Sequence, residues 1–268
     1  MLSLKETSKL LQSAKERKDK GLFIIEGKKM VTEALSIKGA VDCLFMTESL
    51  AGSAPGKELL EGVSCDVSVV PDSSLKKVSG LVTPEGVMAA VSVEAVGNAF
   101  DARLNEGLKK GFPILFLEDL QDPGNLGTII RTAEAAGVSE IVLSKDTVDP
   151  FSPKVVRSTM GSIFRTPVFK CGSEEAFYDN IREKKAEGFS FYASALSGKR
   201  AYTDIIFGEK AAVLIGNEGN GLSERAIASC DEELLIPMEG ETESLNAAVA
   251  AAVIMFEAKR QRGEASKK

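Results

Sequence analysis

Three stretches in the C-terminal half of the sequence place polar side chains where an apolar run gives way to a helical pattern. They are residues 118–133 with Asn125 and Arg131, residues 216–223 with Glu218, and residues 235–256 with Ser244 and Asn246. Open α/β sheets bind ligands at such strand-to-helix junctions, where backbone amides are also exposed. The side chains supply hydroxyl, amide, carboxylate and guanidinium groups, which can hold a ligand and orient a reacting group.

Histidine is absent from the sequence, and this limits the chemistry that those groups can perform. There is no Ser-His-Asp or Cys-His nucleophile, no HExxH zinc site and no ordinary general base near neutral pH. The four cysteines, Cys43, Cys65, Cys171 and Cys230, lie far apart without a CxxC pair, so no metal site is expected. Any reaction must therefore use carboxylates, Lys, Arg, hydroxyls, amides or a bound cofactor.

The glycine-rich loop at residues 216–223 follows an apolar run that ends at Ile215, and it allows a ligand to approach the backbone closely. Its glycine order is GxxGxG and no GK[ST] follows, so it matches neither the dinucleotide nor the P-loop fingerprint. An ordinary glycine-rich turn and a nucleotide-dependent oxidoreductase are the alternatives. The oxidoreductase is disfavoured because no GxGxxG follows a first strand and no downstream acid is placed for a ribose.

Two helix starts position most of these side chains. Asn125 follows Asp-Pro-Gly and has the residue type of an N-cap, and Ser244 is expected to cap the Ala-rich helix that follows it. Arg131 falls almost two turns into the first helix, on a surface of small and apolar residues. A functional cation and an exposed arginine paired with Glu134 or Glu118 both fit this placement.

Continuous apolar runs alternate with helical patterns from residue 111 onward, which predicts a parallel sheet with helices on both faces, an α/β fold. The expected strands are residues 113–117, 141–143, 189–193 and 211–215, and the expected helices are 126–136, 155–160, 174–187 and the stretch after Ser244. The N-terminal residues predict a smaller α/β unit, with helices over 3–19, 28–35 and 73–78, the last capped by Asp72, and strands over 23–25, 41–46, 67–70 and 87–93. A polar stretch separates them, so we expect domains at 1–95 and 111–268 and a linker at 96–110.

The net charge of −6 is unevenly distributed, since residues 1–30 carry eight Lys or Arg against four Asp or Glu. A basic end on an acidic body suits RNA docking, and a solvated helix face explains it equally well. The 44% apolar content is that of a soluble globular protein, and no run of about 18 apolar residues could span a membrane. The N-terminus lacks an apolar secretory segment, so we expect a cytoplasmic location and no membrane partner.

Together, the three stretches resemble a known family. NxGxxxRTA at 125–133, IGNEGNGL at 215–222 and IPMxGxxxSLNAAVAAA at 236–252 resemble, in order and spacing, the three motifs of the SpoU/TrmH-type RNA ribose 2′-O-methyltransferases of the SPOUT superfamily. The resemblance covers residues 111–260 closely. Residues 1–95 look, more weakly, like the L30e-like substrate-binding domain that precedes the catalytic domain in some members. Pro84-Glu85-Gly86 stands where many relatives have His-Gln-Gly.

The resemblance implies a C-terminal trefoil knot that holds S-adenosyl-L-methionine, a homodimer formed through the catalytic domain, and no metal. It implies cofactor contacts at Gly216, Ile236, Met238 and Leu245, and functional polar residues at Asn125, Arg131, Glu218, Ser244 and Asn246. Ribosomal RNA, 23S in particular, is favoured over transfer RNA because the N-terminal domain is present. A non-catalytic RNA-binding protein that keeps the knotted fold is the alternative, and the joint presence of the five polar residues speaks against it.

Methyl transfer from a sulfonium needs the donor held in line with a ribose hydroxyl, without metal or histidine. In the family, the arginine at the position of Arg131 is proposed to deprotonate that hydroxyl. A guanidinium is protonated at any ordinary pH, so stabilising the developing alkoxide or holding an adjacent phosphate is the favoured role. Ser244 and Asn246 are expected to fix the loop, and Glu218 is expected to orient Arg131 or help place the substrate.

Overall fold

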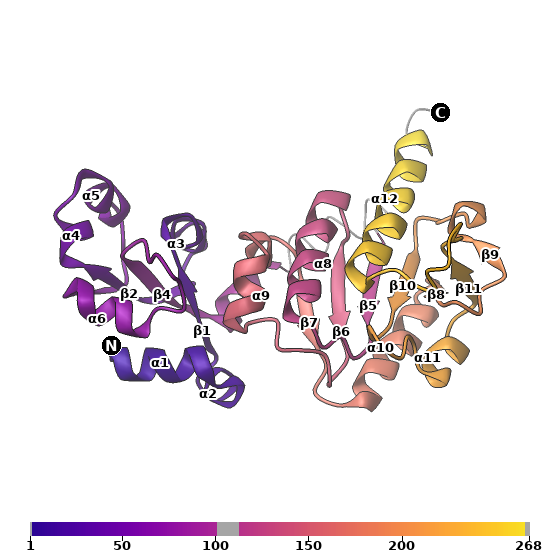
Figure 1. The fold of residues 1–268 in the computed structure, drawn as a ribbon, viewed down its shortest axis with the longest axis horizontal. Coiled ribbons are helices and arrows are strands. Elements are labelled where there is room, and N and C mark those ends of the chain that lie inside the picture. Colours follow the sequence, from indigo (N-terminus) through magenta and orange to yellow (C-terminus); the bar gives the residue numbers. More distant parts are fainter. Residues whose placement is uncertain (1, 101–112, 266–268) are drawn as a thin grey trace. The chain divides into compact units, whose positions relative to one another are not determined.

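The computed structural model describes residues 2–100 and 113–265, which fall into two compact units (Figure 1). The first comprises Met1–Asp101 and Phe151–Phe164, and the second comprises Ala102–Pro150 and Arg165–Lys268. The boundaries expected from sequence assign residues 151–164 to the C-terminal domain, whereas their contacts group them with the N-terminal residues. Of the expected linker, residues 101–110 lie outside the described residues, and residues 93–100 are helical.

The first unit is built on a four-stranded mixed sheet in the order β1-β4-β2-β3, in which β2 and β3 run parallel and the other pairs antiparallel. Its elements in chain order are α1 (Leu4–Gln12), α2 (Ala14–Lys20), β1 (Leu22–Glu26), α3 (Lys28–Leu35), β2 (Val41–Thr47), α4 (Glu48–Ala51), α5 (Ala54–Leu60), β3 (Asp66–Val70), α6 (Asp72–Val78), β4 (Val87–Ser92), α9 (Pro153–Ser158) and the short 3-10 helix η1 (Ser162–Phe164). The strands expected from the N-terminal sequence are present with ends shifted by one residue or more, and the helix expected over residues 28–35 has its expected ends.

Both faces of this sheet are covered. Helices α1 and α6 bury one face around Leu10, Phe45 and Leu75. Phe23 of β1 is fully buried and stacks with Phe151, at 4.8 Å between ring centroids, and with Phe164, at 6.3 Å. Residues 151–164 therefore complete the core of the N-terminal unit.

Two helix ends in this unit differ from expectation. The single helix expected over residues 3–19 is two helices, because Ser13 ends α1 with an N–H bond to the Lys9 carbonyl and caps α2 by accepting from the Glu16 N–H. The prediction that Asp72 caps the later helix is wrong. Pro71 occupies the cap position, and the Asp72 carboxylate instead accepts a hydrogen bond from the backbone N–H of Ser49.

The second unit is a seven-stranded sheet in the order β7-β6-β5-β10-β8-β11-β9, and all of its strands run parallel, which confirms the predicted parallel sheet. Its elements are β5 (Ile114–Leu117), α8 (Pro123–Ala136), β6 (Glu140–Leu143), β7 (Val168–Lys170), α10 (Glu174–Ala186), β8 (Ser190–Ser194), β9 (Arg200–Ala201), the 3-10 helix η2 (Tyr202–Asp204), β10 (Ala211–Ile215), α11 (Glu224–Ala228), β11 (Glu232–Leu235) and α12 (Ala247–Ala265). The edge strands β7 and β9 have too few residues to show periodicity.

Helices α10 and α11 cover one face of this sheet, where Phe116, Phe177 and Phe191 form an aromatic cluster. Helix α12 packs along α8, and Figure 1 shows the two side by side. Lys259 and Arg262 of α12 donate to the carbonyls of Ala135 and Ala136 at the end of α8, each at 2.8 Å. Within residues 2–100 and 113–265, no helix is long and apolar enough to cross a membrane.

Candidate active site

A cavity of about 330 Å³ opens at the carboxyl ends of three adjacent strands, β10, β8 and β11. Parallel strands end at the same edge of a sheet, so the loops that follow them meet there. The walls come from the residues after β8, the glycine-rich loop after β10, the residues after β11 and the start of α12: Ser194, Ala195, Leu196 and Ser197; Ile215 to Leu222; Ile227; Leu235, Ile236 and Met238; and Ser244, Leu245, Ala247 and Ala250.

All four residues expected to contact a cofactor line this cavity: Gly216, Ile236, Met238 and Leu245. In the part of the chain that the structure describes, no backbone hydrogen bond occupies the N–H or C=O groups of Met238 and Leu245. The cavity therefore offers free backbone donors and acceptors between apolar side chains, which is the usual character of a small-molecule site.

Gly216 has a requirement of its own. A Cβ at this position would lie 2.2 Å from the backbone carbon of Gly221. The loop folds back on itself there, with Asn217 and Gly221 exchanging two backbone hydrogen bonds of 3.0 and 2.9 Å. The shape of the loop therefore requires glycine at this position.

Three of the expected polar residues form one chain of hydrogen bonds. The Glu218 carboxylate accepts from the Asn125 side-chain amide at 2.9 Å. The carbonyl oxygen of that same Asn125 amide accepts from the side chain of Asn246 at 2.9 Å. Glu218 also accepts from the backbone N–H groups of Gln121 and Asp122, both at 3.1 Å. The chain joins the loop after β10, the start of α8 and the start of α12.

The helix caps are shifted from those expected. Asp122 caps α8, accepting from the Asn125 N–H at 2.9 Å, so Asn125 lies inside the first turn rather than at the cap. Asn246 occupies the capping position of α12, because its side-chain oxygen accepts from the Ala248 N–H at 2.9 Å. The prediction that Ser244 caps this helix is wrong. Ser244 is exposed and lines the cavity.

The same contacts set the charge state of Glu218. Partial desolvation raises its pKa, but the hydrogen bonds from the Asn125 side chain and from the amides of Gln121 and Asp122 outweigh that effect and lower it below the usual value. Glu218 is therefore a carboxylate at neutral pH. Its position near the amino end of α8 is the one where a helix dipole favours negative charge.

Arg131 lies on the exposed face of α8, and within the described residues no hydrogen bond or ion pair fixes its side chain. Glu134 is paired with Arg165, at 3.1 Å between Nη2 and Oε2, and Glu118 accepts from Tyr178. The interpretation of Arg131 as an arginine paired with Glu134 or Glu118 is therefore wrong. Glu218 does not orient Arg131 either, since its carboxylate binds Asn125 and the loop amides.

Sequence reasoning missed two parts of the site. The loop Ser194–Ser197 forms one wall of the cavity, and a plain Ser-Ala-Leu-Ser run gave no sign of it. Glu118, only 7% exposed, binds Ser223 at the far end of the glycine-rich loop. A carboxylate directly after an apolar strand could have marked Glu118. Among the residues that the structure describes, no group of His, Cys, Asp or Glu is placed to hold a metal ion.

Comparison with known proteins shows which family the sequence matches. Residues 113–256 match the SpoU rRNA Methylase family, and residues 3–89 match the MRM3-like substrate binding domain. The chain is 34% identical to the 23S rRNA (guanosine(2553)-2′-O)-methyltransferase RlmP of Bacillus subtilis, over 92% of each chain. It is 30% identical to the 23S rRNA (uridine(2479)-2′-O)-methyltransferase of Streptomyces viridochromogenes, over 94% of this chain and 88% of the relative.

Solved structures agree. The SpoU methyltransferase AviRb from Streptomyces viridochromogenes in complex with the cofactor AdoMet superposes with a TM-score of 0.87 at 29% identity, covering 97% of both chains. The family match spans more than half of the sequence, and the relatives match it almost from end to end. The protein belongs to the SpoU rRNA methylase family.

Proposed function

We propose that this protein transfers a methyl group from S-adenosyl-L-methionine to a ribose 2′-hydroxyl of RNA, with 23S ribosomal RNA as the favoured substrate. The observation that carries the proposal is the cavity whose loop residue Glu218 is hydrogen-bonded to Asn125 and, through it, to Asn246. The relatives named above catalyse this class of reaction on 23S rRNA.

The cavity fits the proposed cofactor. Ile236, Met238 and Leu245 give it apolar walls, and the free backbone groups of Met238 and Leu245 can bind the edge of an adenine. When bound, S-adenosyl-L-methionine supplies an electrophilic methyl group that needs neither metal nor histidine. The protein's share of the catalysis is then to position the two reactants and to stabilise the charge that develops.

Arg131 fits the second task. Its guanidinium is always protonated and no carboxylate within the described residues neutralises it, so it can stabilise the alkoxide forming at the ribose oxygen or bind the adjacent phosphate. Asn125, Glu218 and Asn246 act differently. Their mutual hydrogen bonds hold the loop after β10 against the starts of α8 and α12, and they fix the geometry of the cavity. Ser244, exposed on the rim, is free to meet a ligand.

The N-terminal unit is proposed as the RNA-docking domain, with an L30e-like fold over residues 1–95. Its match to a substrate-binding domain and the exposed lysines near its N-terminus support this role. Changing Lys18 and Lys29 to Ala should weaken RNA binding and reduce the salt dependence by about one unit of slope per lost phosphate contact. Cofactor affinity should stay unchanged, and an unchanged RNA affinity would move the docking face elsewhere.

A homodimer through the catalytic domain is proposed from the surface of α12. Val249 is 48% exposed and Phe256 is 45% exposed, seven residues apart on one side of the helix. An apolar stripe of this kind is a common protein–protein contact. Sedimentation of the full chain at micromolar concentration should give twice the monomer mass, and a monomer would contradict the proposal.

A trefoil knot is proposed for the C-terminal segment. After β11 the chain returns to α8, which follows β5, and β10 and β8 lie between these two strands in the sheet. This return path and the family resemblance support a knot that encloses the cavity loops. Single-molecule stretching should then give a contour length shorter than that of an unknotted chain of 268 residues.

A ribosomal RNA substrate also supports the expected cytoplasmic location.

The decisive experiment combines binding and transfer. Calorimetry should show that the purified protein binds S-adenosyl-L-methionine, and the protein should transfer labelled methyl groups to 23S rRNA that lacks the modification. Mapping 2′-O-methylation in a strain without the gene should reveal one unmodified ribose. Cofactor binding without transfer to any ribosomal or transfer RNA would instead favour a non-catalytic RNA-binding protein.

A further inference from the structure

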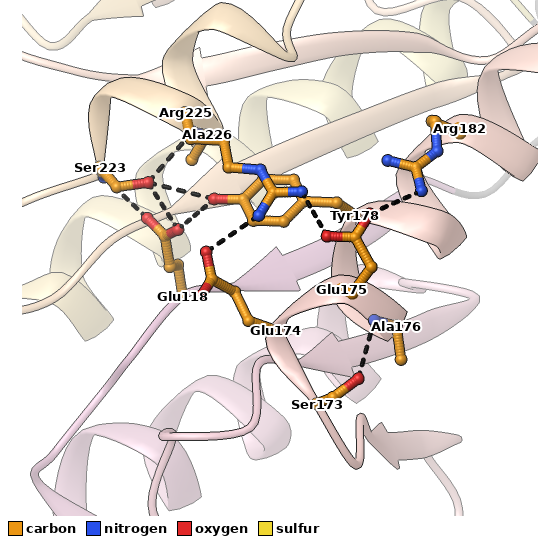
Figure 2. A network of polar contacts seen from close by, with 10 residues as sticks. All are labelled: Glu118, Ser173, Glu174, Glu175, Ala176, Tyr178, Arg182, Ser223, Arg225 and Ala226. Carbon is orange, nitrogen blue, oxygen red and sulfur yellow. Dashed lines mark hydrogen bonds and ion pairs between the residues drawn. The ribbon is translucent and has the colours of Figure 1, made fainter.

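Glu118 is a buried carboxylate at the carboxyl end of β5, with 7% of its surface exposed. Figure 2 shows its side chain directed at Tyr178 of α10 and at Ser223. Its Oε1 accepts from the Tyr178 hydroxyl and from the Ser223 hydroxyl, both at 2.8 Å, and its Oε2 accepts from the Ser223 N–H at 2.8 Å. Both oxygens are therefore engaged by donors from outside β5.

Ser223 is the residue where the glycine-rich loop ends and α11 begins. Its hydroxyl oxygen accepts from the Ala226 N–H at 3.1 Å, as an N-cap does. The preceding residues 215–222 all line the cavity. Glu118 thus fixes the far end of the loop, whereas the near end continues directly from β10.

The loop after β5 and the loop after β10 are joined by two carboxylates, one from each loop, and each carboxylate accepts hydrogen bonds from backbone N–H groups of the other loop. Glu118 of the first loop binds the backbone N–H of Ser223 in the second, and Glu218 of the second binds the backbone N–H groups of residues 121 and 122 in the first. Between them, the Asn217 side chain donates to the Asp119 carbonyl at 2.8 Å. Glu218 belongs to the family motif, and Glu118 is its counterpart outside that motif.

The surroundings of Glu118 make its acceptor role hard to replace. No Lys or Arg in the described chain pairs with it, and its three donors are neutral groups. Arg225 lies over the Tyr178 ring at 3.8 Å and is held by Glu174 and Glu175, as Figure 2 shows. Without the carboxylate, the Ser223 N–H would lose its partner beside a buried site, which is costly.

We propose that Glu118 is a positioning residue for the cofactor site: by holding Ser223 it keeps the glycine-rich loop in the shape that binds S-adenosyl-L-methionine. This rests on the proposed function. Glu118 does not line the cavity and touches no reacting atom, so it acts through the loop.

The test compares cofactor affinity in three full-length variants. Glu118→Leu removes the acceptors at similar size, and Ser223→Ala removes one donor and the side-chain cap while keeping the backbone N–H. Glu118→Leu leaves the Ser223 N–H without its partner and should raise the calorimetric Kd by about 10- to 100-fold, which is about 1.4 to 2.7 kcal/mol, and Ser223→Ala should raise it less. Glu175→Gln is the matched control, because Glu175 belongs to the same network and, among the described residues, its carboxylate accepts hydrogen bonds from Arg225 and Arg182 and from neither Glu118 nor Ser223. Its Kd should equal that of the wild type.

A merely structural role would lower the melting temperature of the ligand-free protein and leave the Kd of the folded protein unchanged. If Glu118→Leu does not fold, Ser223→Ala alone decides between these outcomes. Wild-type affinity in the folded variants, with normal binding by the wild type, would overturn this inference and leave the proposed function intact. Failure of the wild type itself to bind the cofactor would overturn the proposed function instead.

Discussion

The two ends of the parallel strands in the seven-stranded sheet, called here the carboxyl edge and the amino edge, shift the pKa of a glutamate in opposite directions. At the carboxyl edge, Glu218 accepts hydrogen bonds from the Asn125 side chain and two backbone N–H groups, and its pKa is lowered. At the amino edge, Glu140 begins β6, is 5% exposed, and its Oε1 has no hydrogen-bond partner within the described residues. Lys184 lies 3.7 Å from that oxygen, but desolvation dominates and raises the pKa of Glu140.

The direction of the helices explains the difference. Helix α8 begins at the carboxyl edge, and helix starts present N–H groups that bind anions. Helix α8 ends at the amino edge, where its last carbonyls can accept from cations. The side chains of Lys259 and Arg262 donate hydrogen bonds to two of these carbonyls. A carboxylate is therefore easily satisfied at the first edge and poorly at the second. The cavity and Glu218 accordingly lie at the carboxyl edge.

The largest expected effect comes from a cation that neither edge neutralises. Arg131→Ala should fold, dimerise and bind cofactor normally, because no hydrogen bond or ion pair of Arg131 is lost within the described residues. Removing a group that stabilises charge at the reacting oxygen, the role proposed for Arg131, typically lowers turnover by about 100- to 1000-fold. Single-turnover methyl transfer to the cognate RNA measures this.

Arg131→Lys is the companion variant and should recover little activity, because an ammonium does not reproduce the bidentate fork. Near-normal transfer by the alanine variant would show that the exposed guanidinium has no part in the reaction.

The next effect concerns the cap of α12. Asn246→Ala loses the cap bond to Ala248 and the bond to Asn125, and should lower the free energy of unfolding by about 1 kcal/mol or somewhat more. Ser244→Ala is the control, since Ser244 is exposed and has no hydrogen bond in the described part of the chain. Urea unfolding should separate the two variants. Equal losses would argue against Asn246 as the cap.

Glu218 should give an acid-side signature. Its folded pKa lies below its unfolded value of 4.5, so the folded state binds this proton less tightly than the unfolded chain. Its stabilising contribution is present above that value and is lost as the pH falls through the lowered folded pKa. Glu218→Gln should therefore flatten the decline of melting temperature at acid pH, and an unaltered decline would assign it to other carboxylates.

Replacing Glu140 should have the smallest effect on stability, and the pH dependence should be opposite to that of Glu218. Its folded pKa lies above its unfolded value of 4.5, so the folded state binds the proton more tightly and stability falls as the pH rises through this window. Glu140→Gln removes the buried charge and should raise the melting temperature at neutral pH. Below the unfolded pKa the two proteins should melt alike. A lower melting temperature at neutral pH would mean that the ion pair with Lys184 outweighs desolvation.

The buried strands could be predicted from sequence where an apolar run has the length of a strand and clear boundaries. The strand Ala211–Ile215 was expected at its observed ends, because an apolar run bounded by charged residues and glycine has one interpretation. Helix starts were less certain, since two candidate capping residues lie within three positions of each other at both α8 and α12. Asp122 is the N-cap of α8, because Pro123 suits the first helical position. Asn246 is the cap of α12, and its side chain also donates a hydrogen bond to Asn125.

Contacts between distant segments could not be predicted in this way. The link from Glu118 to Ser223, the cavity wall at residues 194–197 and the packing of Phe151 on Phe23 depend on tertiary arrangement, which one-dimensional patterns do not contain. The five polar residues were found because they recur as a spaced set of motifs. The hydrogen bonds that join Asn125, Glu218 and Asn246 are visible only in the structure.

The packing of Phe23 on Phe151 and Phe164 also bears on synthesis. A ribosome makes the chain from its N-terminus, so β1 emerges long before the two phenylalanines that cover it. The apolar face around Phe23 stays open to solvent while β5, α8 and β6 are being translated, and open faces of this kind favour aggregation and chaperone binding. The N-terminal unit therefore matures only after translation of the catalytic unit has begun, and a chain truncated near residue 100 would retain the sticky face permanently.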